Sequence, residues 1–256
     1  MFNVDVLGRY IDAYRSIGAR IEFVLLDCGV DRYWQKRFDK LPVNREYGDD
    51  YWDKFWNAVD ELKGFAREAG FAYEITIPDY PDDYTEKWVR AHCLWSEECS
   101  DYATNIDKTL DNIYRFLDED SGQPWLIPIQ GYENVPESIA PVLEDLMSLS
   151  RRYRFGIANI CTTRSANIIL DTIRIARKVC SNRSFHVFGP SLKGVRKLFE
   201  HRLLLKGDSW DSFGYTWSRK PHVGKVQDIY ERITWFCIYI KRIFDILRYT
   251  GMFKPW

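Results

Sequence analysis

The chain has 256 residues, of which 46% are hydrophobic and 29% charged, and its net charge is −1. This length and apolar content suit one large hydrophobic core, so we expect a single domain over residues 1–256. No stretch approaches the run of about 18 to 20 apolar residues that a membrane helix needs, and the segment MFNVDVLGRY lacks the layout of a signal peptide. We therefore expect a soluble, cytoplasmic protein that binds no membrane.

Short apolar runs that alternate with helical patterns predict an α/β fold with a parallel sheet. After about twenty mainly helical residues, the predicted strands lie at residues 21–28, 71–79, 124–131, 153–160, 184–191 and 210–217. The helices between them are expected at residues 51–69, 85–118, 136–151, 165–180 and 192–207. A last helix, within residues 225–250, has apolar residues on more than one side, so it should be largely buried.

Cysteines show no paired spacing, which indicates reduced thiols that are mostly buried. They stand at positions 28, 93, 99, 161, 180 and 237. The compact group of His92, Cys93 and Cys99 fits no standard zinc pattern and lies in an apolar, aromatic helical segment. We interpret this group as structural packing.

Polar residues gather where the predicted strands end, which is where parallel α/β folds place their chemistry. The strand ends carry Asp27, Asp79, Gln130 with Gly131, Gly156 with Asn159, His186 with Gly189, and Asp208 with Asp211. Carboxylates suit chemistry at the anomeric carbon of a sugar, where one attacks the carbon and another moves a proton. A further carboxylate and an amide can bind the N–H edge and the carbonyl oxygen of guanine. A histidine such as His186 on an apolar strand is more often a core residue than a ligand contact.

Several of these segments resemble motifs of the tRNA-guanine transglycosylase superfamily, in the same order along the chain. VLLDCGV resembles the family's Asp-Ser-Gly-Gly segment, and EITIPDYPDD is similar to the segment whose aspartate holds the purine. IPIQG resembles its Gln-Gly segment, and RFGIAN resembles its Gly-Gly-Leu-Ala segment. The stretch from HVFGPS to GDSWDS is similar to the strand, helix and nucleophile segment of the family. The resemblance covers roughly residues 21–217.

The resemblance implies a role for each matched residue. Asp211 corresponds to the catalytic nucleophile and Asp27 to the general acid and base. The predicted substrate-binding residues are Asp79, Gln130, Gly131, Gly156, Ile157, Asp208 and His186. The implied fold is a (β/α)8 barrel of the TIM type, trimmed or atypically closed at its N-terminal strands, with residues 218–256 as a C-terminal helical extension.

The resemblance also bears on cofactors. The zinc segment that follows the nucleophile in the family has no counterpart, since only His222 and Cys237 follow Asp211. We therefore expect neither a metal nor another cofactor. No glycine-rich phosphate loop and no GxSxG segment is present, so nucleotide triphosphate hydrolysis, dinucleotide binding and serine hydrolase chemistry lack their usual motifs.

Charge is divided unevenly along the chain, which bears on the partner. Residues 1–150 carry 15 basic and 30 acidic side chains, whereas residues 151–256 carry 21 basic and 7 acidic ones. A basic half gathered on one face would bind a polyanion, although the two halves can also neutralise each other within one fold. In size the chain looks like the DpdA-type transglycosylases, which place 7-deazaguanine bases in DNA. We expect exchange of guanine for a 7-deazaguanine such as preQ0, with DNA as the favoured polymer and tRNA as the alternative.

Two other functions stay open. A non-catalytic subunit of a transglycosylase would bind nucleic acid and position a complete partner, as in the unequal pairs of queuine-type enzymes. A nucleoside or base N-glycosidase would use the same carboxylates without needing a basic face.

The chain can also act as a homodimer or heterodimer. Trp210, Tyr215 and Trp217 are candidates for stacking on a flipped base, or for core packing.

Overall fold

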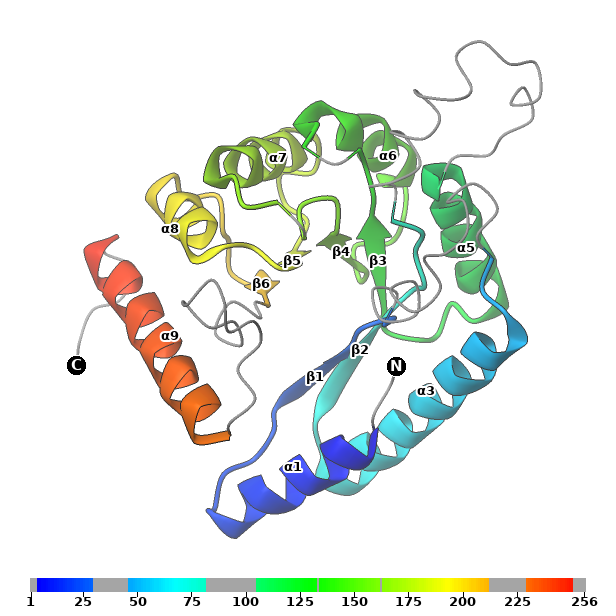
Figure 1. Cartoon of the computed structure of the whole chain (residues 1–256). Coiled ribbons are helices and arrows are strands. Elements are labelled where there is room, and N and C mark those ends of the chain that lie inside the picture. The colour runs from blue at the N-terminus through cyan, green and yellow to red at the C-terminus, as the bar shows by residue number, and fades with distance from the viewer. Residues whose placement is uncertain are drawn as a thin grey trace. The chain divides into compact units, whose positions relative to one another are not determined.

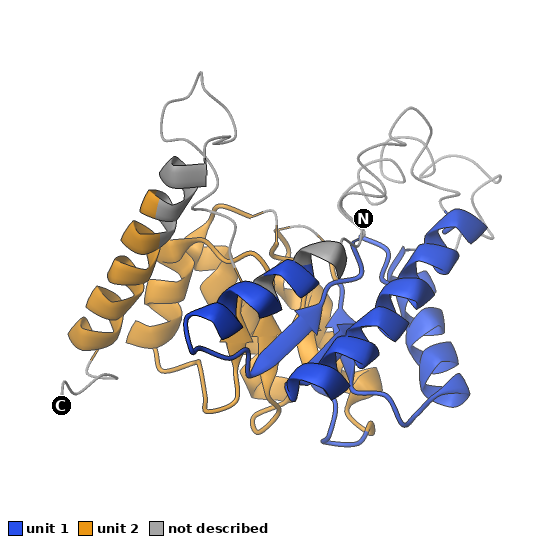
Figure 2. Cartoon of the chain, turned by 90° about the horizontal axis from the view of Figure 1, so that it is seen from below, with its two compact units in different colours: residues 1–130, 150–154 blue, residues 131–149, 155–256 orange. Residues whose placement is uncertain are grey.

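The computed structural model describes residues 4–29, 46–81, 105–132, 134–161, 163–211 and 229–250. The chain divides into two compact units, which Figure 2 colours separately. Unit 1 comprises residues 1–130 and 150–154, and unit 2 comprises residues 131–149 and 155–256. Each unit is an α/β structure whose strands alternate with helices (Figure 1).

Unit 1 contains three parallel strands in chain order. Strand β1 (Phe23–Leu26) pairs with β2 (Ala72–Thr76) in the register Leu26↔Ile75, and β2 pairs with β3 (Trp125–Ile129) in the register Ile75↔Trp125. The helices of this unit are α1 (Val4–Ser16), α3 (Asp49–Ala69) and α5 (Asn105–Glu119). Helix α3 packs against α1 and β2, and α5 packs against β3.

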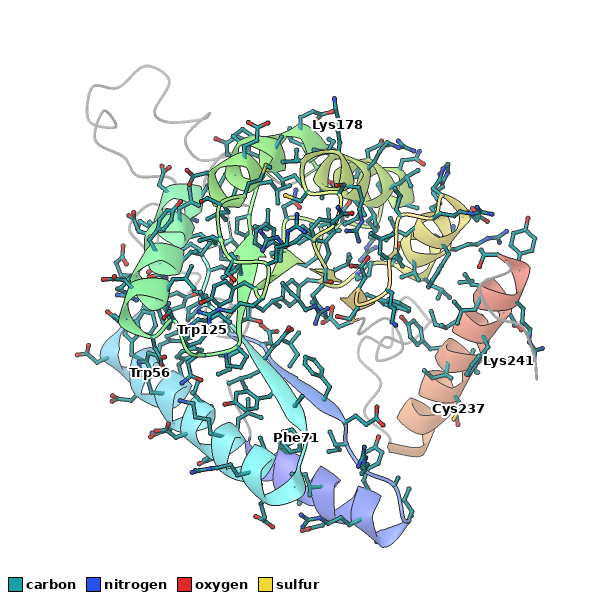
Figure 3. All side chains as sticks on the ribbon, turned by 180° about the vertical axis from the view of Figure 1, so that it is seen from behind. Trp56, Phe71, Trp125, Lys178, Cys237 and Lys241 are labelled. Atoms are coloured by element: carbon teal, nitrogen blue, oxygen red, sulfur yellow. The ribbon has the colours of Figure 1, made fainter. Side chains whose placement is uncertain are left out.

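Aromatic side chains form much of the core of unit 1. The ring of Phe116 on α5 stacks on Trp56 of α3 at 5.5 Å and meets Trp125 of β3 edge-on at 5.2 Å. Trp56 and Trp125 are labelled in Figure 3, as is Phe71, which follows the helix-ending residue Gly70. Gly70 adopts a φ of 72°, a left-handed conformation that glycine reaches without steric cost. The chain can therefore turn from α3 directly into β2.

Unit 2 also contains parallel strands in chain order. Strand β4 (Arg154–Ile157), whose first residue belongs to unit 1, pairs with β5 (Phe185–Val187), and β5 pairs with β6 (Ser209–Trp210). Consecutive strands are joined through helices that pack on one another, α6 on α7 and α7 on α8. The helices are η3 (Pro136–Ser138), α6 (Ile139–Leu146), α7 (Ala166–Val179), α8 (Leu192–Glu200) and α9 (Ile229–Tyr249).

The predicted α/β class with parallel strands is confirmed. All six predicted strands overlap observed ones, and the described residues contain these six rather than eight. The predicted helix at 85–118 is observed from Asn105, since residues 82–104 lie outside the described part, as do residues 212–217 of the last predicted strand.

Helix α8 ends at Glu200, earlier than the predicted end at residue 207. Arg202 adopts a positive φ of 55°, and two backbone hydrogen bonds close the helix end, from Arg202 N to Phe199 O and from Leu203 N to Leu198 O. This is the bonding pattern that usually has glycine at the left-handed position. Because arginine occupies that position here, the sequence pattern did not indicate the end of the helix.

Helix α9 forms as predicted, but the prediction that it is largely buried is wrong for its described side chains. Only Ile246 is buried among them, whereas Phe244 is 45% exposed and Cys237 is also exposed. The apolar positions on several sides of α9 are therefore not all covered. One side of α9 contacts α8, where the Arg196 guanidinium lies 4.9 Å from the Tyr249 ring. The prediction of a buried thiol is also wrong at Cys237, although Cys28 and Cys180 are buried.

Candidate functional site

The end of the sheet in unit 1 holds a buried cluster around Asp79. Gln130 Nε2 donates a hydrogen bond to Asp79 Oδ2, and the Cys28 thiol donates to Asp79 Oδ1 over 3.0 Å. These residues follow β2, β3 and β1, whose carboxyl ends share one edge because the strands are parallel and in register. The structure thus brings together two predicted substrate-binding residues, Asp79 and Gln130. Cys28 joins them although no motif indicated a role for it.

Two tyrosines support this cluster from outside. The Tyr47 hydroxyl donates to the backbone carbonyl of Asp79, and the Tyr51 hydroxyl donates to the carbonyl of Cys28 over 2.7 Å. Their rings stack with centroids 4.0 Å apart. Burial raises the pKa of both phenols well above its usual value, and the neighbouring acidic groups raise it further. Both hydroxyls therefore stay protonated near neutral pH and keep donating to the strand-end loops.

The loop that carries Asp79 is held by α5 as well. Thr109 Oγ1 accepts a hydrogen bond from the backbone N–H of Tyr80 over 2.9 Å, and Asn112 Nδ2 donates to the carbonyl of Pro78 over 2.9 Å. Such side-chain contacts to backbone groups fix the loop on both sides of Asp79. The carboxylate is consequently preorganised rather than held only by its own contacts.

Asp27 differs from Asp79 although it also follows a strand of unit 1. Its side chain is exposed, and its Oδ1 accepts a hydrogen bond from the N–H of Gly29 over 3.2 Å. An exposed carboxylate is accessible for proton exchange with a ligand or with water. Its predicted role as general acid and base stays a prediction.

The end of the sheet in unit 2 holds Asp211, the predicted nucleophile. Its Oδ1 accepts a hydrogen bond from Gly189 N–H over 2.6 Å and lies 3.8 Å from His186 Nε2. The Asp211 side chain is 37% exposed, whereas that of His186 is 5% exposed. His186 Nδ1 in turn lies 2.8 Å from Ser209 Oγ. The structure therefore joins two predicted residues, Asp211 and His186, and adds Ser209 to them.

Gly189 is suited to its contact with Asp211 for a steric reason. It adopts a φ of 59°, and a Cβ atom at this position would lie 2.8 Å from the carbonyl oxygen of Cys161. Real Cβ atoms do not approach backbone that closely, so a side chain here would force the loop to move. Glycine at position 189 keeps its N–H directed at the Asp211 carboxylate.

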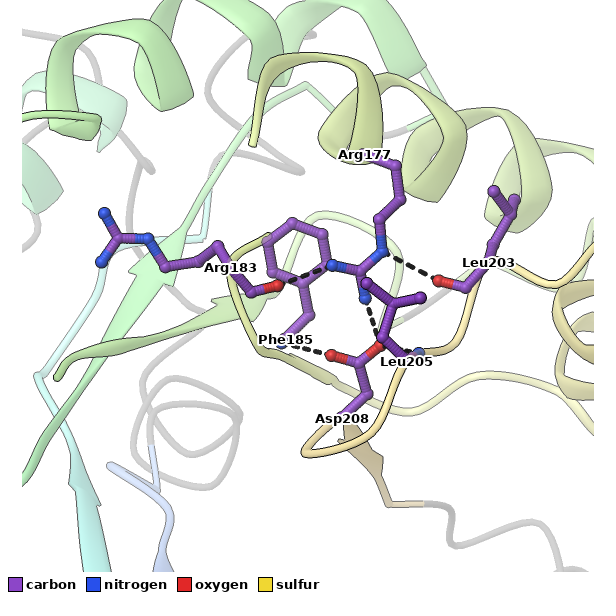
Figure 4. A network of polar contacts seen from close by, with 6 residues as sticks. All are labelled: Arg177, Arg183, Phe185, Leu203, Leu205 and Asp208. Atoms are coloured by element: carbon purple, nitrogen blue, oxygen red, sulfur yellow. Dashed lines mark hydrogen bonds and ion pairs between the residues drawn. The ribbon is translucent and has the colours of Figure 1, made fainter. Parts of the chain in front are cut away.

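Asp208 lies in a separate network, drawn in Figure 4. Its carboxylate is 1% exposed and forms an ion pair with the Arg177 guanidinium. It also accepts hydrogen bonds from the N–H groups of Phe185, over 2.7 Å, and Leu205, over 2.6 Å. Arg177 donates further to the carbonyls of Leu203 and Arg183. These contacts fix the start of β5 and the loop before β6, which gives Asp208 a structural role. A contact of Asp208 with substrate stays a prediction.

The remaining predicted residues of unit 2 lie in tightly packed backbone. A Cβ atom at Gly131 would meet Ser138 Oγ at 2.6 Å and Ile139 Cγ2 at 2.8 Å, so glycine is needed there for packing. Gly156 is the register partner of His186, and Ile157 is fully buried. Their predicted position beside a bound base stays a prediction.

Asn159 is a strand-end residue to which we assigned no role. Its side chain is 2% exposed, and neither its Oδ1 nor its Nδ2 has a hydrogen-bond partner among the described residues. A buried amide without partners costs about 1 to 3 kcal/mol per group. The sequence carries no signal for this feature, because asparagine after a strand is common in loops.

The remaining predictions from the sequence concern metal binding, base stacking and membrane-spanning helices. No group of three or more His, Cys, Asp or Glu residues that could hold a metal ion occurs within the described ranges, while His92, Cys93, Cys99 and His222 lie outside them. Trp210 packs edge-on against Phe199 with centroids 5.5 Å apart, and Tyr215 and Trp217 are not in the described part. In the described part of the chain, no helix has the length and apolar content needed to span a bilayer.

Comparisons with models of protein families, with curated proteins and with solved structures each give no match to this chain. The resemblance to the tRNA-guanine transglycosylases therefore rests on the strand-end motifs alone.

Proposed function

We propose that the protein is a base-exchanging glycosyltransferase that replaces guanine in a nucleic acid with a 7-deazaguanine such as preQ0. The observation that carries the proposal is the setting of Asp211. Its carboxylate is 37% exposed at a strand end and is anchored through Oδ1 by the Gly189 N–H. A carboxylate at a strand end, with over a third of its side chain open to solvent, suits nucleophilic attack on a sugar carbon.

In the proposed reaction Asp211 attacks C1′ of the target nucleotide while the bond from C1′ to N9 of guanine breaks. Asp27 gives a proton to the departing guanine, which leaves a covalent aspartyl-glycosyl intermediate. The incoming 7-deazaguanine then attacks C1′ through N9, Asp27 accepts the N9 proton, and the Asp211 ester bond breaks. Neither a metal nor an organic cofactor is required by these steps.

Recognition of the base is assigned to Asp79 and Gln130. Ionised Asp79 accepts hydrogen bonds only, so it suits the N–H edge of a purine. Gln130 Nε2 carries two hydrogens, of which one is directed at Asp79. The second suits the carbonyl oxygen of guanine. The mutual hydrogen bond fixes the orientation of the amide, which is what discrimination between a carbonyl and an amino group on the base requires.

A nucleic acid as substrate is favoured by the charge of the second half of the chain. Exposed basic residues of unit 2 include Lys178 and Lys241, which are labelled in Figure 3, and Arg202 and Lys206. Phosphate contacts by such residues release counterions, so binding should weaken steeply as salt increases. DNA is the favoured polymer and tRNA the alternative, and the proposed architecture is a trimmed or atypically closed (β/α)8 barrel.

The experiment compares Asp211→Asn with the unmodified protein in exchange of radiolabelled guanine or preQ0 into DNA and, separately, into tRNA. We expect exchange to fall at least about 10³-fold, because the amide is not a nucleophile. The matched control is Asp171→Asn, which changes an exposed aspartate of the same unit paired with Arg174. Exchange by Asp211→Asn at the rate of this control would refute the assignment.

The other two functions predict different results. A non-catalytic subunit binds the polymer but exchanges no base on its own. An N-glycosidase releases guanine from nucleosides and binds neither DNA nor RNA even at low salt.

A further inference from the structure

Three polar residues of unit 2, Ser209, His186 and Asp211, lie in a row at the end of the sheet. Ser209 and His186 are direct register partners on the parallel strands β6 and β5. Ser209 Oγ lies 2.8 Å from His186 Nδ1, and His186 Nε2 lies 3.8 Å from Asp211 Oδ1. Ser209 precedes Asp211 by two residues, so β6 and the residue that follows it supply both Ser209 and Asp211, with His186 of β5 between them.

The ring of His186 is held in place by its surroundings. Its side chain is 5% exposed, and the Phe188 ring meets it edge-on with centroids 4.5 Å apart. A neutral imidazole carries its proton on one nitrogen, and the hydrogen bond at the other nitrogen decides which. When the Ser209 hydroxyl donates to Nδ1, the proton must sit on Nε2, the nitrogen that faces the carboxylate.

We propose that Ser209 and His186 are positioning residues for Asp211. Ser209 fixes the tautomer of His186, so that the Nε2–H of His186 faces Oδ1 of Asp211 at 3.8 Å, while the Gly189 N–H donates a hydrogen bond to the same oxygen. The role of Asp211 rests on the proposed function, but the tautomer of His186 does not.

The order of the three residues also speaks against Ser209 as a nucleophile. In a serine hydrolase the serine is the accessible end of the chain and the aspartate is the buried one. Here the aspartate is the accessible end, 37% exposed, and the serine lies behind the nearly inaccessible histidine. Among these three residues, the group that is accessible to a substrate is therefore the Asp211 carboxylate and not the Ser209 hydroxyl.

The first experiment needs no activity. The ¹⁵N NMR shifts of the His186 ring are measured at pH about 9, well above the usual pKa of histidine. His186→Gln assigns the signals among the four histidines of the chain. We expect the Nε2–H tautomer in the unmodified protein and a mixture of both tautomers in Ser209→Ala. An Nδ1–H tautomer in the unmodified protein, or an unchanged tautomer in Ser209→Ala, would overturn the proposal.

The second experiment measures base exchange. We expect Ser209→Ala to lower kcat about 10- to 100-fold with KM unchanged, the range found when the hydrogen-bond partner that orients a metal-ligating histidine is removed. Ser209→Thr, which keeps the hydroxyl, should restore kcat, and Ser148→Ala on the exposed surface is the control. A loss as complete as that of Asp211→Asn, or no loss, contradicts the positioning role. If neither the unmodified protein nor any variant exchanges a base, the proposed function fails. The orientation of His186 still stands in that case, provided that the NMR result is as expected.

Discussion

Asp79 at the sheet end of unit 1 and Asp211 at the sheet end of unit 2 have opposite surroundings. Asp79 in unit 1 is 4% exposed and accepts hydrogen bonds from Gln130 and Cys28, inside a shell of buried tyrosines. Asp211 in unit 2 is 37% exposed and accepts a hydrogen bond from the Gly189 N–H. An enclosed carboxylate with fixed donors suits recognition, whereas an accessible one suits reaction. A third aspartate, Asp208, is more buried still and has a structural role, since it is bound by an arginine and two backbone N–H groups.

Removal of the structural aspartate should have the largest effect on stability. Asp208→Ala leaves the Arg177 guanidinium, 9% exposed, without its carboxylate, so we expect the free energy of unfolding to fall by about 3 to 5 kcal/mol. Urea denaturation followed by circular dichroism measures this change. The control is Asp171→Ala, whose ion pair with Arg174 is exposed and should contribute under about 1 kcal/mol. Equal losses in the two variants would remove the distinction between the networks.

Asp79→Asn tests whether unit 1 recognises the base. The new amide places an N–H group among the donors of Cys28 and Gln130, so we expect a loss of stability of about 1 to 3 kcal/mol. Base recognition should weaken at the same time, which raises KM for the incoming base more than it lowers kcat. Asp111→Asn, an exposed change on α5, serves as the control. A large fall in kcat with unchanged KM would instead place Asp79 in the chemical step.

The smallest effect concerns the tyrosines behind Asp79, and it depends on pH. Because burial raises the pKa of Tyr47 in the folded protein, the unfolded chain releases that proton first as pH rises above about 10, and stability falls with pH. Tyr47→Phe should reduce this slope by up to about 1.4 kcal/mol per pH unit. Urea denaturation between pH about 9 and 11 gives the slope. Tyr14→Phe, at a tyrosine that is 43% exposed, should leave it unchanged, and the same slope in both variants contradicts the account.

Much of the fold was predictable because strands are read from local apolar runs. The residues 71–79 and 124–131, for example, contain β2 and β3, and the residues that follow them lie together as expected. The end of α8 was not predictable, since a left-handed Arg202 is stabilised by backbone contacts rather than by residue type. The exposure of α9 depends on which of its sides meets α8, which a pattern of apolar residues does not encode.

The candidate site was predictable in its residues and less so in its contacts. Asp79 and Gln130 were both expected to face a base, yet they also bind each other. The distinction between Asp208 and Asp211 rested on a motif, whereas in the structure it is a difference in burial, 1% against 37% exposed. The contact of Ser209 with His186 follows from the register of β5 and β6, which the sequence does not specify. Such pairings arise between strands far apart in the sequence.

The central claim is that Asp211 forms a covalent bond to the sugar. The most direct measurement is the intact mass of the protein after incubation with a guanine-containing oligonucleotide and rapid denaturation, followed by peptide mapping of the modified site. The account predicts an adduct on the peptide with Asp211 and none in Asp211→Asn. An adduct that persists in Asp211→Asn, or base exchange without any adduct to Asp211, would contradict it.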